Sequence, residues 1–343
     1  MDLFEVKTID KRFYEEHLKD FLPKRITDIH THVYLNSLRS KRTNKKWPSL
    51  VANENSIEQL VETYKLMFPD KEVTPMIFSS ANRNDNLDAL NGYIEESAEK
   101  YDFPSLIYAA PWQSGSELEE KILKGGFLGC KVYLSLSAEY IPENEIRIFD
   151  FLPHHHLEVL NNHGWIAMLH IPRPGRLKDR VNVEQMLEIE QKYPNVKLII
   201  AHVGRAYCNE DVGQSLEILQ ETENMLFDFS ANTNQWVFEE LIKRIGPKRI
   251  LFGSDLPILR MRSRRICEDG LYINLVPKGL YGDVSFDIHM RELIGEEADN
   301  LTFMLYEQID AFRRASRNTG LSKEDIEDVF YNNARRIIDS ITR

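Results

Sequence analysis

The chain has 343 residues and a formal net charge of −11 at pH 7. This length suits either two ordinary domains or one large α/β barrel with insertions. Hydrophobic residues make up 42% and charged residues 28% of the chain, which is typical of a globular protein rather than a disordered or fibrous one. The acidic balance argues against a general nucleic-acid binder, which usually presents a basic face.

The cysteines and the first residues bear on the cellular compartment. Cys130, Cys208 and Cys267 lie far apart and form no Cys-X-X-Cys pair, which is typical of a reduced intracellular protein rather than a disulfide scaffold. The start, MDLFEVKTIDKRFYEEH, is too charged for the apolar core of a signal peptide, and no stretch is long and apolar enough for a membrane span. We therefore expect a cytoplasmic protein with no membrane partner.

Along the chain, short apolar runs rich in β-branched residues alternate with longer amphipathic segments. Several of the runs are apolar at nearly every position, as parallel strands covered on both faces are. The amphipathic patterns predict helices between them, for example at 56–68, 182–193 and 235–245. The predicted strands are 26–30, 74–80, 105–110, 128–134, 165–171, 197–203, 226–230 and 249–255.

Eight strands alternating with helices predict one (β/α)8 barrel, a TIM barrel, over residues 1–343, with an N-terminal helical extension at 1–25. The alternative is a doubly wound open sheet, which would normally carry a glycine-rich turn after its first strand, where this chain has HTHVYLN. Long connections follow the first and the last strand, from about 33 to 55 and from about 256 to 290. In a barrel, both would lie at the end where active sites are found.

A final packing helix is predicted near the C-terminus. Ser322 has the position of an N-cap residue. An apolar stripe follows it at Ile326, Phe330, Ile337 and Ile338, which would face the rest of the protein.

The stretch TDIHTH at 27–32 places two histidines one residue apart. Alternate residues of a strand point to one face, so Asp28, His30 and His32 would share the barrel interior near its carboxyl-end rim. Two imidazoles at this spacing can bind one metal ion, but the pair alone is weak evidence, because a polar strand end also carries histidines. Asp28 is better interpreted as a supporting residue than as a ligand.

Three later strand ends carry residues of the same kind. His170 lies at the end of the fifth predicted strand, His202 near the end of the sixth, and Asp255 at the end of the eighth. Singly, each histidine could be a hydrogen-bonded core residue, and Asp255 could cap the next turn. Together with the first pair they are hard to produce by accident, and imidazoles with one carboxylate suit Zn²⁺ or a similar divalent ion.

These motifs, in this order and spacing, resemble the amidohydrolase superfamily, specifically its amidohydrolase-2 branch of metal-dependent hydrolases, lactonases and non-oxidative decarboxylases. The resemblance runs over nearly the whole chain, from DIHTH through GFLGCKVY, MLHIPR, IIAHVGR and FGSDLP to NNARRI. It implies that His30, His32, His170 and Asp255 bind or approach the metal, with one ion favoured and two left open. Asp255 would also be the general base, and His202 would polarise the substrate carbonyl or ligate a second ion.

Lys131 lies in the predicted strand at 128–134. Three roles are open for it. It could reach solvent, it could be carboxylated and bridge two metals as in some superfamily members, or its ammonium could hold a substrate carboxylate.

Basic residues gather in the segments that follow the strand ends. The lysines and the arginine of the first long loop, Lys41, Arg42, Lys45 and Lys46, are best interpreted as a solvated face. An arginine fork binds carboxylate or phosphate, so we expect an anionic small-molecule substrate. The arginines assigned to it are Arg173, Arg205, Arg260 and Arg262, with Arg264 and Arg265 next in the last loop.

Other histidines are not assigned to the site. Three consecutive histidines at 154–156, at a predicted helix start, cannot all face one ion. His163 precedes Gly164 at a predicted helix end, and His17 and His289 stand alone.

We predict a metal-dependent hydrolase that acts on an ester, lactone or amide bond of a small anionic acid. The alternative is a non-oxidative decarboxylase on the same metal site. A third hypothesis is a barrel that binds metal or ligand without turnover. Family members are often dimeric or larger, so a homo-oligomer is left open.

Overall fold

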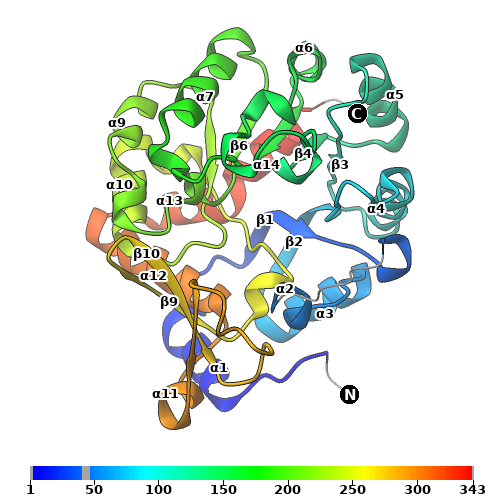
Figure 1. The fold of residues 1–343 in the computed structure, drawn as a ribbon. Coiled ribbons are helices and arrows are strands. Elements are labelled where there is room, and N and C mark those ends of the chain that lie inside the picture. The colour runs from blue at the N-terminus through cyan, green and yellow to red at the C-terminus, as the bar shows by residue number, and fades with distance from the viewer. Residues whose placement is uncertain (1–2, 41–46, 342–343) are drawn as a thin grey trace.

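The computed structural model describes residues 3–40 and 47–341, and it contains all eight predicted barrel strands in order (Figure 1). The basic residues of the first loop, Lys41, Arg42, Lys45 and Lys46, lie outside the described residues. The strands are β1 (Arg25–His32), β2 (Glu72–Phe78), β3 (Ile107–Tyr108), β4 (Gly129–Val132), β5 (Ile166–Leu169), β6 (Lys197–Ile200), β7 (Leu226–Asp228) and β8 (Ile250–Leu251).

The strands close into a barrel. β1 pairs with β2 and β3 to β8 form one sheet, all in parallel. Backbone hydrogen bonds close both gaps, from Leu106 N to Ile77 O (3.0 Å) and from Asp255 N to His30 O (2.8 Å). These bonds bring the carboxyl ends of β1 and β8 together and confirm the predicted (β/α)8 barrel.

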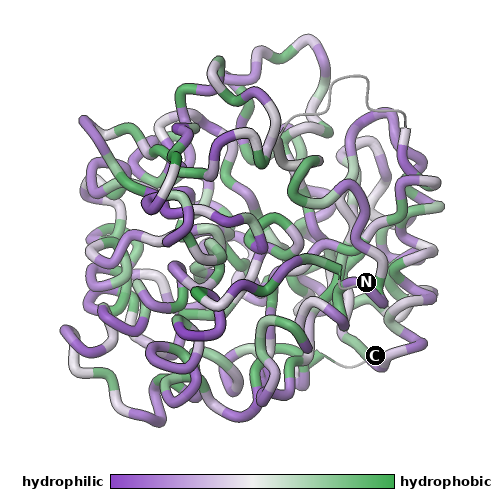
Figure 2. Tube along the Cα trace, turned by 90° about the horizontal axis from the view of Figure 1, so that it is seen from below, coloured by the Kyte–Doolittle hydropathy of each residue, from purple (hydrophilic) through white to green (hydrophobic). Residues whose placement is uncertain are grey.

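Helices alternate with the strands and surround them, and hydrophilic segments run along the outside of the trace (Figures 1 and 2). The predicted helices at 56–68, 182–193 and 235–245 are α3 (Ile57–Met67), α7 (Arg180–Lys192) and α10 (Gln235–Ile245). The others are α1 (Thr8–Phe13), α2 (Trp47–Val51), α4 (Leu87–Tyr101), α5 (Gly115–Gly125), α6 (His154–His163), α8 (His202–Arg205), α9 (Ser215–Leu219), α11 (Gly295–Asp299), α12 (Met304–Thr319), α13 (Lys323–Glu327) and α14 (Asn333–Asp339). Within the described part of the chain, no helix has the length and apolar content needed to cross a membrane.

The predicted C-terminal helix is confirmed as a run of three helical pieces. Ser322 is its N-cap, and its Oγ accepts a hydrogen bond from Asp325 N at 3.1 Å. A π-helical turn at Asp328–Asn332 joins α13 to α14. Phe330 is fully buried against the barrel, so the apolar stripe faces the core as expected.

A glycine at the start of β4 allows the close strand contact that places Lys131. Gly129 has φ +141°, and a Cβ there would lie 2.1 Å from the carbonyl oxygen of Ile166 in β5. No other residue fits that approach without moving one of the strands. Lys131, two residues later, consequently lies in the barrel wall and is almost fully buried.

The connection after β8 folds into a small sheet that the sequence patterns did not predict. β9 (Arg264–Glu268) is antiparallel to β10 (Leu271–Pro277), and β10 is parallel to β11 (Met290–Leu293). In Figure 1 this sheet lies beside the N-terminal segment that carries α1.

Cys208 and Cys267 form a disulfide, so the expectation of unpaired cysteines is wrong for these two. The residues are 59 positions apart, but β9 folds back onto the segment after β6 and brings their Cα atoms to 5.8 Å. Such a contact depends on the path of a long loop, which cysteine spacing does not reveal. Cys130 is the free cysteine among the described residues and is buried in β4, as expected.

A buried ion pair ties α1 to the connection after β8. The two terminal guanidinium nitrogens of Arg262 donate to the two carboxylate oxygens of Asp10, at 2.8 and 2.7 Å. Arg262 also donates to the carbonyl oxygen of Leu301, and Thr302 Oγ1 donates to Asp10. The charges therefore satisfy each other inside the fold.

Replacing Arg262 by Met should lower the free energy of unfolding by about 3–5 kcal/mol, because Asp10 would keep a buried, uncompensated charge. Urea unfolding measures this change. Arg264→Met is the matched control, since Arg264 is an exposed arginine paired with Glu307, and should cost less than about 1 kcal/mol. Equal effects of the two substitutions would contradict this role for Arg262.

Candidate metal centre

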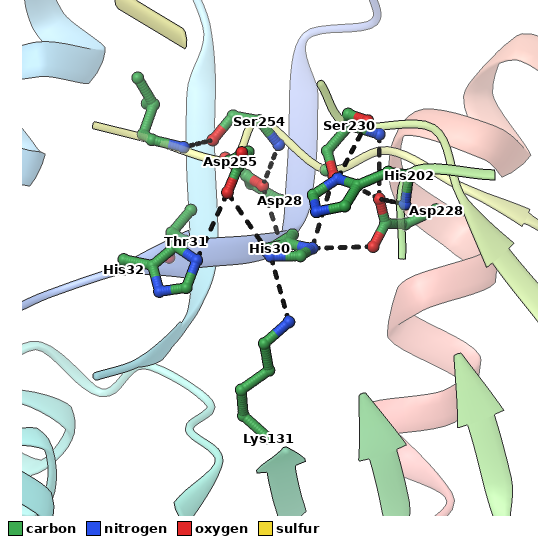
Figure 3. Close-up of polar contacts among 12 residues, drawn as sticks. Asp28, His30, Thr31, His32, Lys131, His202, Asp228, Ser230, Ser254 and Asp255 are labelled. Atoms are coloured by element: carbon green, nitrogen blue, oxygen red, sulfur yellow. Dashed lines mark hydrogen bonds and ion pairs between the residues drawn. The ribbon is translucent and has the colours of Figure 1, made fainter. Parts of the chain in front are cut away.

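His30, His32 and Asp255 converge where β1 ends beside the segment after β8 (Figure 3). Asp255 Oδ1 lies 3.4 Å from His32 Nε2 and 3.6 Å from His30 Nε2. Asp255 has φ +54°, a left-handed conformation that is costly for a non-glycine residue and that occurs preferentially at functional sites. One carboxylate oxygen and two ring nitrogens thus face a common point.

Hydrogen bonds fix the orientation of both imidazoles. His30 Nδ1 lies 2.8 Å from Asp228 Oδ2, and His32 Nδ1 lies 3.0 Å from the carbonyl oxygen of Ser79. Since both partners are acceptors, each Nδ1 carries the proton and each Nε2 keeps a free lone pair. This is the arrangement by which metal-binding histidines are usually held.

The charge state of the cluster also suits a cation. Burial lowers the pKa of His30 to about 3, assisted by the nearby charge of Lys131, so this imidazole is neutral at pH 7. Burial alone would raise the pKa of Asp255, but the close contact with His32 and the neighbouring imidazoles hold it at about 2. The centre therefore offers the neutral imidazole of His30 and the carboxylate of Asp255, with the ring of His32 beside them.

These residues fit a divalent metal ion in donor type and in packing. Histidine nitrogens with a carboxylate oxygen are the usual ligands of Zn²⁺ and related ions. Gly253 lies directly against His30, because a Cβ at position 253 would be only 2.8 Å from the Cβ of His30. A larger residue at 253 would displace His30 from its position.

His202 lies on the other side of His30, with the two ring centroids 4.9 Å apart. Its Nδ1 is 2.9 Å from Ser230 Oγ, and its backbone N–H donates to Asp228 Oδ1 at 3.2 Å. His202 also has a left-handed backbone, with φ +59°. His30, His202 and Asp228 form a second group of metal-competent side chains.

Asp228 and Ser230 are site residues that the sequence interpretation missed. Asp228 ends β7 and is fully buried, and it accepts hydrogen bonds from His30, His202 and Ser230. Its negative charge is kept by these contacts, since they lower its pKa against the opposing effect of burial. The signal was present in LFDFS, where a carboxylate interrupts an apolar strand.

Lys131 extends from β4 toward His30, and its Nζ lies 3.4 Å from His30 Nε2 (Figure 3). Only 1% of its surface is exposed, so the solvent-reaching role is wrong. Burial lowers the pKa of its amine to about 8, while Asp228 and Asp255 act in the opposite direction. The bridging and carboxylate-holding roles both fit this position.

Asp28 supports the centre rather than joining it. Its carboxylate accepts hydrogen bonds from Ser254 N at 2.8 Å and from Tyr64 Oη at 2.7 Å. Ser254 precedes Asp255, so the first bond joins β1 to the segment that carries the candidate base, and the second joins β1 to α3. Burial raises the pKa of Asp28 to about 7 despite these bonds.

His170 lies beside His202 rather than within the cluster of His30, His32 and Asp255. Its ring centroid is 5.3 Å from that of His202, and its buried Nδ1 has no hydrogen-bond partner among the described residues. Burial and the charge of Arg205 hold its pKa well below the usual range. The side chain is therefore a neutral imidazole, as a metal ligand needs, but within the described chain it lacks the hydrogen bond that orients His30 and His32, and it lies outside both groups of metal-competent side chains.

A cavity of about 390 Å³ opens beside His170. Arg205, Arg83 and Tyr133 line it, together with residues of the segment after β4. One terminal nitrogen of Arg205 donates to backbone carbonyls of residues 171–173, which anchors the side chain in the wall. Arg83 is bound by the carbonyl oxygens of Leu136 and Ser137.

The other three predicted arginines do not line this cavity. Arg173 pairs with Asp179 at 3.2 Å and borders a separate surface hollow. Arg260 packs over Phe4 and donates to the carbonyl oxygen of Val51. Arg262 is held by Asp10, as described above, so the expectation that it binds substrate is corrected.

The remaining histidines lie apart from the centre, as expected. His155 Nε2 and His156 Nε2 both contact the carbonyl oxygen of Gln113, at 2.9 and 2.8 Å. His163 ends α6, and Gly164 caps the helix with φ +66°. His289 Nδ1 contacts the carbonyl oxygen of Tyr272.

A family model described as amidohydrolase, of the amidohydrolase-2 type, matches residues 28–339. The chain belongs to the amidohydrolase family. This confirms the resemblance, and the matched range extends from Asp28 in β1 to Asp339 in α14. No curated protein sequence matches the chain.

Solved structures share the amidohydrolase barrel at low identity. A probable 2-pyrone-4,6-dicarboxylic acid hydrolase from Acinetobacter baumannii, with citric acid bound, has a TM-score of 0.57 and 14% identity over 92% of this chain and 99% of its own. A dihydroxybenzoic acid decarboxylase from Polaromonas sp. JS666, with manganese and the inhibitor 2-nitroresorcinol, has a TM-score of 0.56 and 15% identity over 92% and 97%. A 2,6-dihydroxybenzoate decarboxylase bound to 2,6-dihydroxybenzoate has a TM-score of 0.55 and 12% identity over 92% and 99%.

Asp228→Asn should weaken metal binding by about 10- to 100-fold, because the carboxylate that orients His30 would be lost. Competition with a chelator, read by the metal content of the recovered protein, measures the affinity. Asp310→Asn is the control, since Asp310 is also buried and ion-paired but lies in α12. An Asp228→Asn protein that binds metal as tightly as the unmodified chain would refute the orienting role.

Proposed function

We propose that this amidohydrolase is a metal-dependent hydrolase that opens an ester, lactone or amide bond of a small carboxylate-bearing substrate. One observation carries the proposal. His30 Nε2, His32 Nε2 and Asp255 Oδ1 face one point at the carboxyl end of the barrel. A cavity of about 390 Å³ opens beside His170, whose ring contacts that of His202, and His202 in turn contacts His30.

We assign metal binding to His30, His32, His170 and Asp255. A bound divalent ion, with Zn²⁺ the leading candidate, would lower the pKa of a coordinated water to about 7 and polarise the scissile carbonyl. The steps that the chain itself performs are holding the substrate, moving one proton and stabilising developing negative charge.

Asp255 is proposed as the general base. Its Oδ1 faces both ring nitrogens, and its low pKa makes it a carboxylate at neutral pH that can accept a proton. The protonated Asp255 would then donate that proton to the leaving oxygen or nitrogen. The left-handed backbone at 255 aims this side chain into the centre.

His202 is proposed to orient the substrate carbonyl. Its Nδ1 is held by Ser230, so the other ring nitrogen is left for a ligand. Nε2 can donate to a developing oxyanion only when it carries a proton, as in the imidazolium; in the neutral ring its lone pair would instead ligate a second ion. Its backbone N–H donates to Asp228, the carboxylate that also binds His30, so the position of His202 is fixed relative to His30.

Arg205 is proposed to bind the substrate carboxylate. Its guanidinium lines the cavity beside His170, and only one of its terminal nitrogens is bonded to the backbone carbonyls. The remaining nitrogens can bind a carboxylate as a planar fork. The citrate and dihydroxybenzoate carried by two structural neighbours have the same chemistry, which supports this choice.

A decarboxylase on the same centre is the second candidate. Two of the neighbours described above are named as decarboxylases of hydroxylated benzoates. The ring of Tyr133 packs against His170 at 4.8 Å and gives the cavity an aromatic wall, which would suit an aromatic acid. Asp255 would first take a proton from solvent water and then deliver it to the ring carbon as CO₂ leaves, so that one proton replaces the carboxylate on the ring.

Removal of the metal by a chelator should abolish turnover, and added metal should restore it. Asp255→Asn should lower kcat by a factor of about 100 to 10,000, because the proton acceptor is lost. A panel of lactones and aromatic acids provides the assay, and Asp310→Asn should retain activity. Full activity of the metal-free protein would refute the proposed class of enzyme.

Isotope labelling separates the two reactions. A hydrolase run in ¹⁸O water should place one labelled oxygen in the product carboxylate and release no CO₂. A decarboxylase should release CO₂ and take up one solvent deuterium on carbon in D₂O. Carbon dioxide as the stoichiometric product would therefore replace the hydrolase assignment with the second candidate.

A further inference from the structure

A second hollow lies at the opposite end of the barrel from the candidate metal centre. Its volume is about 690 Å³. Residues that lead into three neighbouring strands line it, namely Lys197 at the start of β6, Leu226 at the start of β7 and Arg249 just before β8. The end of α6 and one face of α14 complete the wall. Because the strands are parallel, their amino ends lie far from the end that carries His30 and Asp255.

Cationic side chains dominate this hollow, although the chain as a whole is acidic. Lys197, Lys248, Arg249 and Arg336 line it, and Glu223 is the carboxylate in its lining. Lys248 and Arg336 share one carboxylate, that of Asp328, and Arg336 also donates to the side-chain oxygen of Asn333.

Arg249 is held by neutral oxygens, the nearest being Thr222 Oγ1 at 2.8 Å. Its other hydrogen bonds go to the backbone carbonyls of Ile245, Met225 and Gln220. Glu190 lies close enough to act on the charge of Arg249, but its Oε1 accepts the backbone N–H groups of Glu223 and Asn224. The hollow therefore keeps an excess of positive charge.

Lys197 is the residue whose charge is least compensated. Its side chain is half-buried, and its Nζ makes no hydrogen bond or ion pair with any residue of 3–40 or 47–341. The Nζ lies 3.7 Å from the position that a Cβ would take on Gly164, at the end of α6. The partial negative charge of a helix end gives some compensation, but burial still lowers the pKa of this amine.

Neutral donors surround the charged groups. The amide side chains of Asn162, Asn195 and Asn224 and the hydroxyl of Ser340 also line the hollow. Lysine and arginine beside amide and hydroxyl groups are the usual partners of an oxyanion that carries several acceptor oxygens. An anion placed here would remove the cost of burying an unpaired ammonium.

We propose that this hollow is a binding site for a phosphate-bearing small molecule, with Lys197 and Arg336 as its principal charged contacts. The site is independent of the proposed reaction, since it shares no lining residue with the metal centre or its cavity. Binding would join α14 and the end of α6 to the floor of the barrel and would stabilise the folded chain.

Isothermal titration of the metal-loaded protein with inorganic phosphate tests the site. The unmodified chain should bind, and Lys197→Gln should weaken binding by about 10- to 100-fold, as expected for the loss of one charge-assisted contact. Lys192→Gln is the matched control, because Lys192 is an exposed lysine of α7 that pairs with Glu188 outside the hollow. Arg205→Gln tests for phosphate bound at the catalytic end instead.

The temperature of thermal unfolding, measured in chloride and in phosphate, gives a second test. In chloride, Lys197→Gln should unfold at the same temperature as the unmodified chain or a higher one, because an unpaired, half-buried charge has been removed. In phosphate, only the unmodified chain and Lys192→Gln should gain stability. Absence of phosphate binding, equal binding by Lys197→Gln, or loss of binding in Arg205→Gln would each overturn the proposal.

Discussion

The hydrogen bond between His30 Nδ1 and Asp228 Oδ2 is the contact on which the centre depends. It crosses the barrel interior from β1 to β7, so its length is set by the closure of the sheet rather than by any loop. It decides which nitrogen of His30 carries the proton and therefore which one faces Asp255. Through Asp228 it also fixes Ser230 and His202 on the far side.

The barrel and much of the centre could be predicted from the sequence because both depend on local patterns. Parallel strands buried on both faces are apolar runs, and their carboxyl ends all lie at one end of a barrel. A histidine or carboxylate that ends such a run can therefore be assigned to that end of the barrel once the strands are recognised. His30, His32 and Asp255 were placed in this way.

The features that were not predicted depend on contacts between distant segments. The pair formed by Asp10 and Arg262 spans 252 residues, and the disulfide between Cys208 and Cys267 joins the segment after α8 to β9. Arg262 follows a candidate ligand closely in sequence, but its side chain turns toward α1 and pairs there with the buried carboxylate of Asp10. In the small sheet, β9 and β11 are largely exposed or half-exposed and carry no apolar run, so the apolar run of β10 (LYINLVP) has no strand-like neighbour in the sequence to indicate a sheet.

Anomalous diffraction from crystals of the metal-loaded protein, recorded at the absorption edge of the bound metal, tests the central claim most directly. The geometry predicts a peak within about 2.0–2.2 Å of His30 Nε2, His32 Nε2 and one oxygen of Asp255. His170 should complete the ligand set on the side of the cavity. A map with no peak within bonding distance of His30 and His32 would contradict the assignment of a metal centre to this barrel.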